Sequence, residues 1–187
     1  NYGGSNAPLR GKKGTRWEGG FRVPCIMRWP GRIPAGSVCS EVATAMDFLP
    51  TLAGLAGRQP PQDRIIDGKD ILSLMTDPAN AKSPYDAFYY GQGGGLSAVR
   101  VGDWKLHMAT GELYNLRADI GESTDVAEAH ADVVRELTAV ADIGRRDLGD
   151  VLTERKGENV RPCGRVENAK PLTEYDPDHP YMVALYD

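Results

Sequence analysis

The chain has 187 residues, of which 41% are hydrophobic, so it is long enough for one domain with a core or for parts of two. Its formal net charge of −4 and sequence pI of about 5.4 argue against a general nucleic-acid binder. No run of residues approaches the roughly 18 apolar residues of a membrane span. We therefore expect neither nucleic acid nor a membrane among its partners.

The segment Asn6–Pro24 combines glycines, cations and one tryptophan between two prolines. Its glycines are Gly11, Gly14, Gly19 and Gly20. Glycines allow sharp turns and a close approach of the backbone to a ligand. Lys12 and Lys13 lie between two of them, so their ammonium groups are expected to project from a tight loop. Such a loop suits an oxyanion, because backbone N–H groups and a cation converge there. The alternative is a solvated basic turn.

The first elements predicted in chain order are a strand and two helical segments. Phe21–Arg28 is a short apolar run bounded by a glycine pair and prolines, which predicts a buried strand with Cys25 in a core. Asp47 is typical of a helix N-cap, and apolar residues at helical spacing follow it until Gly57. A short helical turn is predicted over Asp70–Met75.

From Ala87 the pattern changes to short strands separated by glycine-containing turns, which predicts an antiparallel meander. The predicted strands are Phe88–Tyr90, Ser97–Val101, Trp104–Met108 and Glu112–Asn115. Asp132–Leu148 is predicted to be an amphipathic helix that covers one face of this sheet. Its apolar stripe consists of Val133, Leu137, Val140 and Ile143. After Gly149 we expect an irregular tail, with a short strand at Val151–Glu154.

These elements divide the chain into three parts. Residues 1–85 are expected to be the end of a larger α/β layer, and residues 86–150 a small antiparallel sheet with one packed helix. Residues 151–187 are expected to be an extended tail. The predicted fold class is therefore α/β, with α+β character in the C-terminal part. One buried strand cannot satisfy its own edges or cover both of its faces, so we expect a further N-terminal part to complete the layer.

The stretch Pro8-Leu-Arg-Gly-Lys-Lys-Gly-Thr-Arg-Trp-Glu-Gly-Gly-Phe-Arg-Val-Pro24 closely resembles the P-L-R-G-x-K-G-[ST]-x-[WYF]-E-G-G-x-R-V-P signature of type I, arylsulfatase-like sulfatases. Further blocks follow in the family's order as far as about residue 150. They are Arg28-Trp-Pro-Gly-Arg-Ile-Pro-Ala-Gly36, Met46-Asp-Phe-Leu-Pro-Thr-Leu52, Asp67-Gly68, Gly102-Asp-Trp-Lys-Leu106, Glu112-Leu-Tyr-Asn-Leu-Arg-Ala-Asp119 and Gly121-Glu122. The resemblance implies the C-terminal portion of a formylglycine-dependent sulfatase with an alkaline-phosphatase-like α/β layer.

Hydrolysis of a sulfate ester needs a strong nucleophile, neutralisation of charge on the sulfuryl oxygens and help for the leaving alkoxide. The resemblance implies that a formylglycine and a divalent cation, usually calcium, serve these needs, with the formylglycine and the calcium ligands upstream of this chain. No cysteine here lies in the C-x-P-S-R context from which the family makes formylglycine. Lys13 matches the family's sulfate-contacting lysine and is the expected catalytic and substrate-binding residue, whereas Lys12 is expected to be a surface charge.

Further candidates surround Lys13. Trp17 and His107 are candidate substrate-binding residues. The alternative for Trp17 is a packing role under the loop, and for His107 it is a place on a solvent-facing strand surface. Arg10, Glu18 and Arg22 are candidates for groups that hold the loop, and a pair between one of these arginines and Glu18 is favoured. No metal-ligand set is predicted within the chain, because its three histidines are scattered.

The leading hypothesis is therefore the C-terminal portion of a sulfatase that acts on a sulfated small molecule or glycan and is inactive as an isolated chain. A phosphoesterase or phosphonate hydrolase of the alkaline-phosphatase-like superfamily is one alternative. A non-catalytic, sulfatase-like binding module is another. The family implies a periplasmic or secreted location, and the sequence itself names no compartment.

Overall fold

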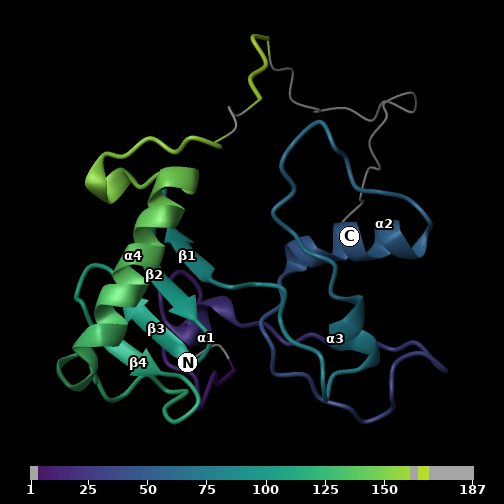
Figure 1. The fold of residues 1–187 in the computed structure, drawn as a ribbon, viewed down its shortest axis with the longest axis horizontal. Coiled ribbons are helices and arrows are strands. Elements are labelled where there is room, and N and C mark those ends of the chain that lie inside the picture. The colour runs from purple at the N-terminus through teal and green to yellow at the C-terminus, as the bar shows by residue number, and fades with distance from the viewer. Residues whose placement is uncertain (1–3, 161–163, 169–187) are drawn as a thin grey trace.

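A single four-stranded antiparallel sheet organises the computed structural model, which describes residues 4–160 and 164–168 (Figure 1). The strands are β1 (Phe88–Gln92), β2 (Gly95–Val101), β3 (Trp104–His107) and β4 (Leu113–Asn115). They lie in sequence order across the sheet, each paired with the next. The predicted meander is confirmed, and each predicted strand overlaps an observed one.

The helices are short apart from the last one. They are α1 (Glu18–Phe21), α2 (Phe48–Leu55), α3 (Leu72–Thr76) and α4 (Ala131–Leu148), with 3₁₀ helices η1 (Ala45–Asp47), η2 (Glu128–His130) and η3 (Val151–Thr153). Within the described residues, no helix has both the length and the apolar character that crossing a membrane requires.

Helix α4 covers one face of the sheet, and the core lies between them. Because side chains alternate along a strand, one face of the sheet collects the apolar residues. The fully buried cluster consists of Leu96, Val99, Leu106, Leu113, Leu137 and Ala141. The range predicted for this helix is confirmed, but the stripe differs at its C-terminal end. Ile143 is 57% exposed, and Gly144 packs on the ring of Tyr89 instead.

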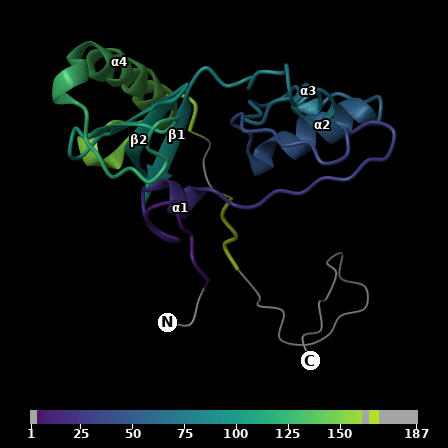
Figure 2. The ribbon, with the colours of Figure 1, turned by 90° about the horizontal axis from the view of Figure 1, so that it is seen from below.

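The opposite face of the sheet is covered by residues 4–22, which include α1. Figure 2 shows α1 and α4 on the two sides of the strands. Lys105 and His107 alternate with Leu106 along β3, so they point to this second face, and both are 0% exposed. The alternative that placed His107 on a solvent-facing surface is therefore wrong.

The predicted strand at Phe21–Arg28 does not form. After α1 the backbone is irregular, Val23 and Ile26 are 80% and 95% exposed, and Cys25 is exposed as well. A strand needs a neighbour to pair its N–H and C=O groups, and no strand within the described residues lies beside this segment. The predicted core position of Cys25 is wrong for the same reason.

The short strand predicted at Val151–Glu154 is also absent. The 3₁₀ helix η3 occupies this position, and one isolated bridge joins Asp150 to Arg155. The Asp150 side chain accepts the amide hydrogens of Leu96 and Leu152, so it ties this turn to the start of β2. Most of the predicted tail beyond it lies outside the described residues.

Helices α2 and α3 lie apart from the sheet in both views (Figures 1 and 2). The helix predicted from Asp47 is confirmed, but its cap differs. Thr44 and Asp47 form a capping box at η1, and the buried Asp47 carboxylate also accepts the amide hydrogen of Lys69 at 2.8 Å. Asp47 therefore links α2 to the segment before α3. The division of the chain at residues 85 and 150 stays a prediction, although residues 4–22 pack on the sheet across the first boundary.

The contact of Gly144 with Tyr89 generates a stability prediction. In Gly144→Ala the new Cβ would lie 2.4 Å from a carbon of the Tyr89 ring, so the ring or α4 must shift. We expect the free energy of unfolding to fall by about 1–3 kcal/mol, in spite of the higher helix propensity of alanine. The matched control is Gly54→Ala in α2, where the nearest atom is 3.9 Å away. There we expect a gain of about 0.5–1 kcal/mol. Urea denaturation measures both changes, and an equal effect of the two substitutions would contradict this contact.

Candidate active site

The Lys13 loop, residues 10–22, is closed on itself. Gly11 and Gly14 have φ values of +84° and +83°, which favour glycine. The amide of Gly19 donates to the carbonyl of Arg10 at 2.8 Å, and a Cβ on Gly19 would lie 2.6 Å from that oxygen. The predicted turns are thus confirmed, and the close approach that Gly19 allows is to the backbone of the loop itself.

The loop uses its arginines and its lysines differently. Arg10 and Arg16 hydrogen-bond to Glu122 and His107 outside the loop, and Arg22 pairs with Glu18 inside it. Lys12 and Lys13 are exposed, and neither ammonium group has a hydrogen bond or ion pair with any residue that the structure describes. The two lysines at the tip of the loop are therefore unpaired among the described residues, whereas the three arginines are hydrogen-bonded.

Glu18 anchors the start of α1 to the sheet, and it is 1% exposed. Its carboxylate lies 2.6 Å from Nε of Arg22 and 2.9 Å from Nζ of Lys105, and it accepts the hydroxyl of Tyr90 at 2.8 Å. Burial opposes ionisation of this carboxyl, but Lys105, Arg22 and Tyr90 outweigh burial and lower its pKa to about 2. The favoured pair between Glu18 and one of the two arginines is present, and its partner is Arg22.

Lys105 on β3 is the centre of the buried polar contacts. Its ammonium lies 2.9 Å from Glu18 and 2.8 Å from Glu122, and it donates to the carbonyl of Arg16 at 2.9 Å. The same nitrogen is 4.2 Å from the centre of the Tyr90 ring. The Lys105 side chain is 0% exposed. Two carboxylates balance its charge, and its ammonium group has three hydrogen-bond acceptors, namely Glu18, Glu122 and the carbonyl of Arg16.

Glu122, between β4 and α4, links the Lys13 loop to β3 and is fully buried. One carboxylate oxygen accepts the amide of Glu18 at 2.7 Å, and the other lies 3.0 Å from Nε2 of His107. Its backbone carbonyl accepts Nη1 of Arg10 at 2.7 Å. Burial acts to raise the pKa of this carboxyl, but the bonds from His107, Lys105 and the Glu18 amide lower it below its usual range.

His107 is held between an arginine and a carboxylate. Nε of Arg16 donates to Nδ1 at 2.7 Å, so Nδ1 is unprotonated and Nε2 carries the proton that is donated to Glu122. Burial and the charges of Lys105 and Arg16 lower the pKa of His107, despite the bond to Glu122, and they favour the neutral ring. Its predicted contact with substrate stays a prediction, and such a contact would require the Arg16 side chain to move.

Trp17 lies under the loop and is half-buried. The guanidinium of Arg10 is 3.6 Å from the centre of its ring, and the rings of His107 and Tyr114 are 4.5 and 5.9 Å away. These contacts give Trp17 a packing role between the loop and the sheet. A contact between Trp17 and substrate stays a prediction.

Nothing in the described part of the chain offers a metal site, since no group of three or more His, Cys, Asp or Glu side chains could hold an ion. Cys25 and Cys39 are exposed, and Cys163 lies outside the described residues. The side chains described here therefore do not supply a ligand set for calcium.

Sequence reasoning missed Arg16, Lys105 and Glu122. Lys105 carried a signal, because it alternates with apolar Trp104 and Leu106 in a predicted strand. The second face of that strand was not predicted to be covered, so its lysine was not expected to be buried. Glu122 has a φ of +51°, which is uncommon outside glycine and which nothing in the local sequence predicts.

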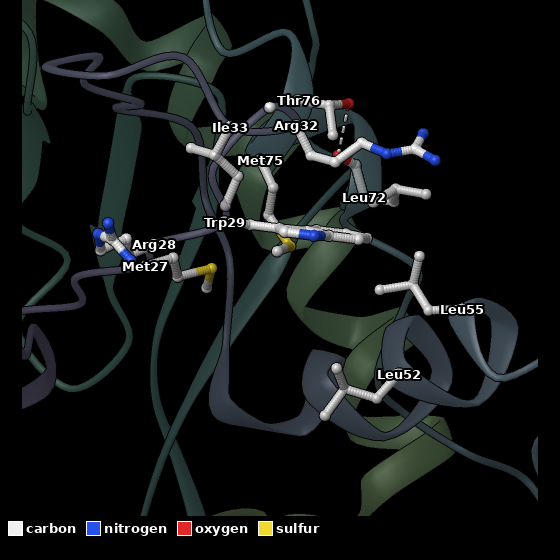
Figure 3. Close-up of a pocket in the computed structure, with 11 residues that line it drawn as sticks. Met27, Arg28, Trp29, Arg32, Ile33, Leu52, Leu55, Leu72, Met75 and Thr76 are labelled. Atoms are coloured by element: carbon white, nitrogen blue, oxygen red, sulfur yellow. Dashed lines mark hydrogen bonds between the residues drawn. The ribbon is translucent and has the colours of Figure 1, made fainter.

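A groove of about 760 Å³ lies between the segment after residue 26 and helices α2 and α3 (Figure 3). Its lining is mostly apolar, with Leu52 and Leu55 from α2 and Leu72 and Met75 from α3. The guanidinium of Arg32 lies 5.6 Å from the centre of the Trp29 ring at this groove. Leu52 and Leu55 are also partly exposed to solvent, and no residue that lines the groove takes part in the buried contacts around Lys105.

Known proteins with similar sequences are sulfatases. The chain is 46% identical over 110 residues to the N-acetylgalactosamine-6-sulfatase of Canis lupus familiaris, covering 59% of this chain and 20% of the relative. It is 47% identical over 88 residues to the steryl-sulfatase of Mus musculus, covering 47% of this chain and 14% of the relative. The chain therefore spans about a fifth or less of the length of these relatives.

The fold is also similar to that of a solved sulfatase structure. The structure of the PsFucS1 sulfatase from Pseudoalteromonas sp. matches with a TM-score of 0.68 and 25% identity, covering 82% of this chain and 34% of that one. The family described as "N-sulphoglucosamine sulphohydrolase, C-terminal" matches residues 12–142, which is more than half of the chain. The resemblance seen in the sequence motifs is confirmed. The chain therefore belongs to the sulfatase family, in the part that this description names.

Proposed function

We propose that this chain is the C-terminal part of an enzyme that hydrolyses sulfate esters, and that it supplies Lys13 to the active site. One observation carries the proposal. Within a loop whose arginines are all engaged, the ammonium of Lys13 is exposed and unpaired among the described residues. The position of Lys13 in the sulfatase signature, together with membership of that family, supports this role over that of an ordinary surface charge.

Lys13 would act as a point charge on the sulfate group. An ammonium in contact with a sulfuryl oxygen, the leaving-group oxygen or both would stabilise the negative charge that develops as the S–O bond breaks. The family implies that a formylglycine supplies the nucleophile and calcium supplies further positive charge. The family implies that the formylglycine and the calcium ligands lie upstream of this chain.

The substrate class that we propose is a sulfated small molecule or glycan. The two relatives described above are named for an amino-sugar sulfate and a steryl sulfate. Membership of the family therefore does not identify which sulfated compound is the substrate. An exposed, flexible cation recognises the sulfate group itself, which every member of this class shares.

We also propose that another part of the same polypeptide covers the apolar surface formed by Val23–Met27 and the outer face of α2. Ile26 is 95% exposed, and Leu49 and Leu52 of α2 are 53% and 57% exposed. Exposed apolar surface of this extent marks an interaction site. The backbone of this segment pairs with no strand among the described residues, which favours a sheet edge as the partner. The small share of the relatives that this chain spans is consistent with such a part.

Replacing Lys13 tests its role in catalysis. In the full-length protein we expect Lys13→Met to lower kcat/KM for an aryl sulfate such as 4-nitrophenyl sulfate by about 100-fold or more, because a charge at the reacting group is lost. The matched control is Lys12→Met, which removes a neighbouring exposed cation and should change kcat/KM less than about threefold. Equal losses in the two variants would refute the assignment of Lys13.

Replacing Ile26 tests the proposed cover. If another part of the full-length protein buries this side chain, Ile26→Glu places a charge in an apolar contact. The free energy of unfolding should then fall by about 3 kcal/mol or more. The control is Ile143→Glu on α4, at a residue that is 57% exposed, where we expect a change within about 0.5 kcal/mol. Thermal unfolding monitored by circular dichroism compares them. A neutral effect of Ile26→Glu would show that the segment faces solvent.

The isolated chain is expected to be inactive. Purified on its own, it should show no hydrolysis of 4-nitrophenyl sulfate with or without added calcium, because the proposed nucleophile lies elsewhere. Metal-dependent turnover by the isolated chain would contradict this prediction. Reading the coding sequence upstream of Asn1 is an independent check, and a C-x-P-S-R block in the same frame is the expected result.

A further inference from the structure

We propose that Gln92, Lys105 and Glu122 are positioning residues that set the location of the Lys13 ammonium. Gln92 belongs to β1, Lys105 to β3, and Glu122 to the connection between β4 and α4. The inference rests on the proposed role of Lys13 in sulfate ester hydrolysis. It adds to that role a mechanism by which the small sheet takes part in the active site.

Gln92 holds the tip of the loop. Its Nε2 donates to the carbonyl of Gly14, the residue after Lys13, at 2.6 Å. On the other side of Lys13, the carbonyl of Lys12 accepts the hydroxyl of Thr15 at 2.7 Å and its amide at 3.0 Å. The backbone is therefore fixed on both sides of Lys13, and one of the two fixing groups belongs to the sheet.

Lys105 and Glu122 bind the loop at residues on either side of its tip, on the face that packs against the sheet. The carboxylate of Glu122 accepts the amide of Glu18, and the carbonyl of Glu122 accepts the guanidinium of Arg10, each at 2.7 Å. Lys105 donates to the carbonyl of Arg16 at 2.9 Å. Three points along the loop are thus bonded to two fully buried residues of the sheet region.

This attachment has a direct consequence for Lys13. Its side chain makes no contact of its own with the described residues that would fix it, so the backbone beneath it determines where the ammonium can reach. A displacement of about 1 Å of a catalytic group can lower a rate by about 100-fold. Residues that hold this backbone therefore act on the reaction through Lys13, without touching the substrate.

The first test is Gln92→Leu in the full-length enzyme. Gln92 is exposed, so this substitution should leave the thermal midpoint within about 1 °C of the wild type. We expect kcat for 4-nitrophenyl sulfate to fall about tenfold. The matched control is Gln62→Leu, which removes another exposed glutamine that donates to a backbone carbonyl, that of Pro60 at 2.9 Å. An unchanged kcat in Gln92→Leu would overturn the role of Gln92.

A double-mutant cycle separates positioning from general structural damage. If Gln92 acts through Lys13, adding Gln92→Leu to Lys13→Met should change the residual kcat less than about twofold. A tenfold loss that persists in the Lys13→Met background would show that Gln92 does not act through Lys13, and would overturn the proposal for this residue.

Hydrogen exchange tests Lys105 and Glu122 without any need for activity. Glu122→Gln has the same shape but cannot accept both from the Glu18 amide and from Lys105 and His107, because one of its two ends is a donor. We expect amide exchange in a peptide covering residues 10–22 to rise by about tenfold or more. The control is Glu41→Gln, at an exposed pair with Lys82 at 3.2 Å. Unchanged exchange in Glu122→Gln would overturn this part of the inference.

The two kinds of measurement also separate the inference from the proposed function. If the wild-type full-length protein hydrolyses no sulfate ester, the proposed function fails, and exchange still decides whether Glu122 holds the loop. If the wild type is active and Glu122→Gln does not fold, the Gln92→Leu cycle still decides whether a residue of the sheet acts through Lys13, because the Gln92 side chain lies on the surface.

Discussion

The ammonium of Lys105 lies between the carboxylates of Glu18 and Glu122, with all three side chains withdrawn from water. Inside a protein such charges are tolerated only when they are paired and hydrogen-bonded, and removing one partner of a buried pair costs about 3–5 kcal/mol. Glu18 belongs to the loop and Lys105 to the sheet. The pair between Glu18 and Lys105 therefore forms only when the loop lies on the sheet, and the candidate site depends on this constraint.

The two faces of the sheet are covered in different ways. Helix α4 buries the face of Val99 and Leu106 by apolar contact, which depends on complementary shape rather than on paired donors and acceptors. The other face is covered by an irregular loop that uses charged and polar groups, and every buried side-chain N or O atom among the described residues has a hydrogen-bond partner. Directional bonds fix a loop more closely than apolar contact does, because each donor must meet its own acceptor. The polar face is therefore the one suited to present a catalytic side chain.

Local patterns in the sequence predicted much of the small sheet and α4, because alternation, glycine turns and helical spacing involve residues that are close in sequence. The strand at Phe21–Arg28 could not be judged in the same way, since pairing depends on a neighbour that this chain does not provide among its described residues. The burial of His107 was missed because its cover is a loop without periodicity. Lys105 and Glu18 are 87 residues apart, and no local pattern signals that they meet.

The contrast between arginine and lysine in the Lys13 loop follows from the same physics. A guanidinium offers several donors in a rigid plane, and Arg10 and Arg16 use theirs to join the loop to Glu122 and His107. An ammonium on a flexible stem is a poorer structural link but a better movable charge, and the lysines at the tip are left unpaired among the described residues. A rigid frame that limits where this cation can reach suits the proposed role of Lys13 at a sulfate group. Lysine in place of Arg10 or Arg16 would lose the planar set of donors that joins the loop to Glu122 and His107, and so would weaken the frame.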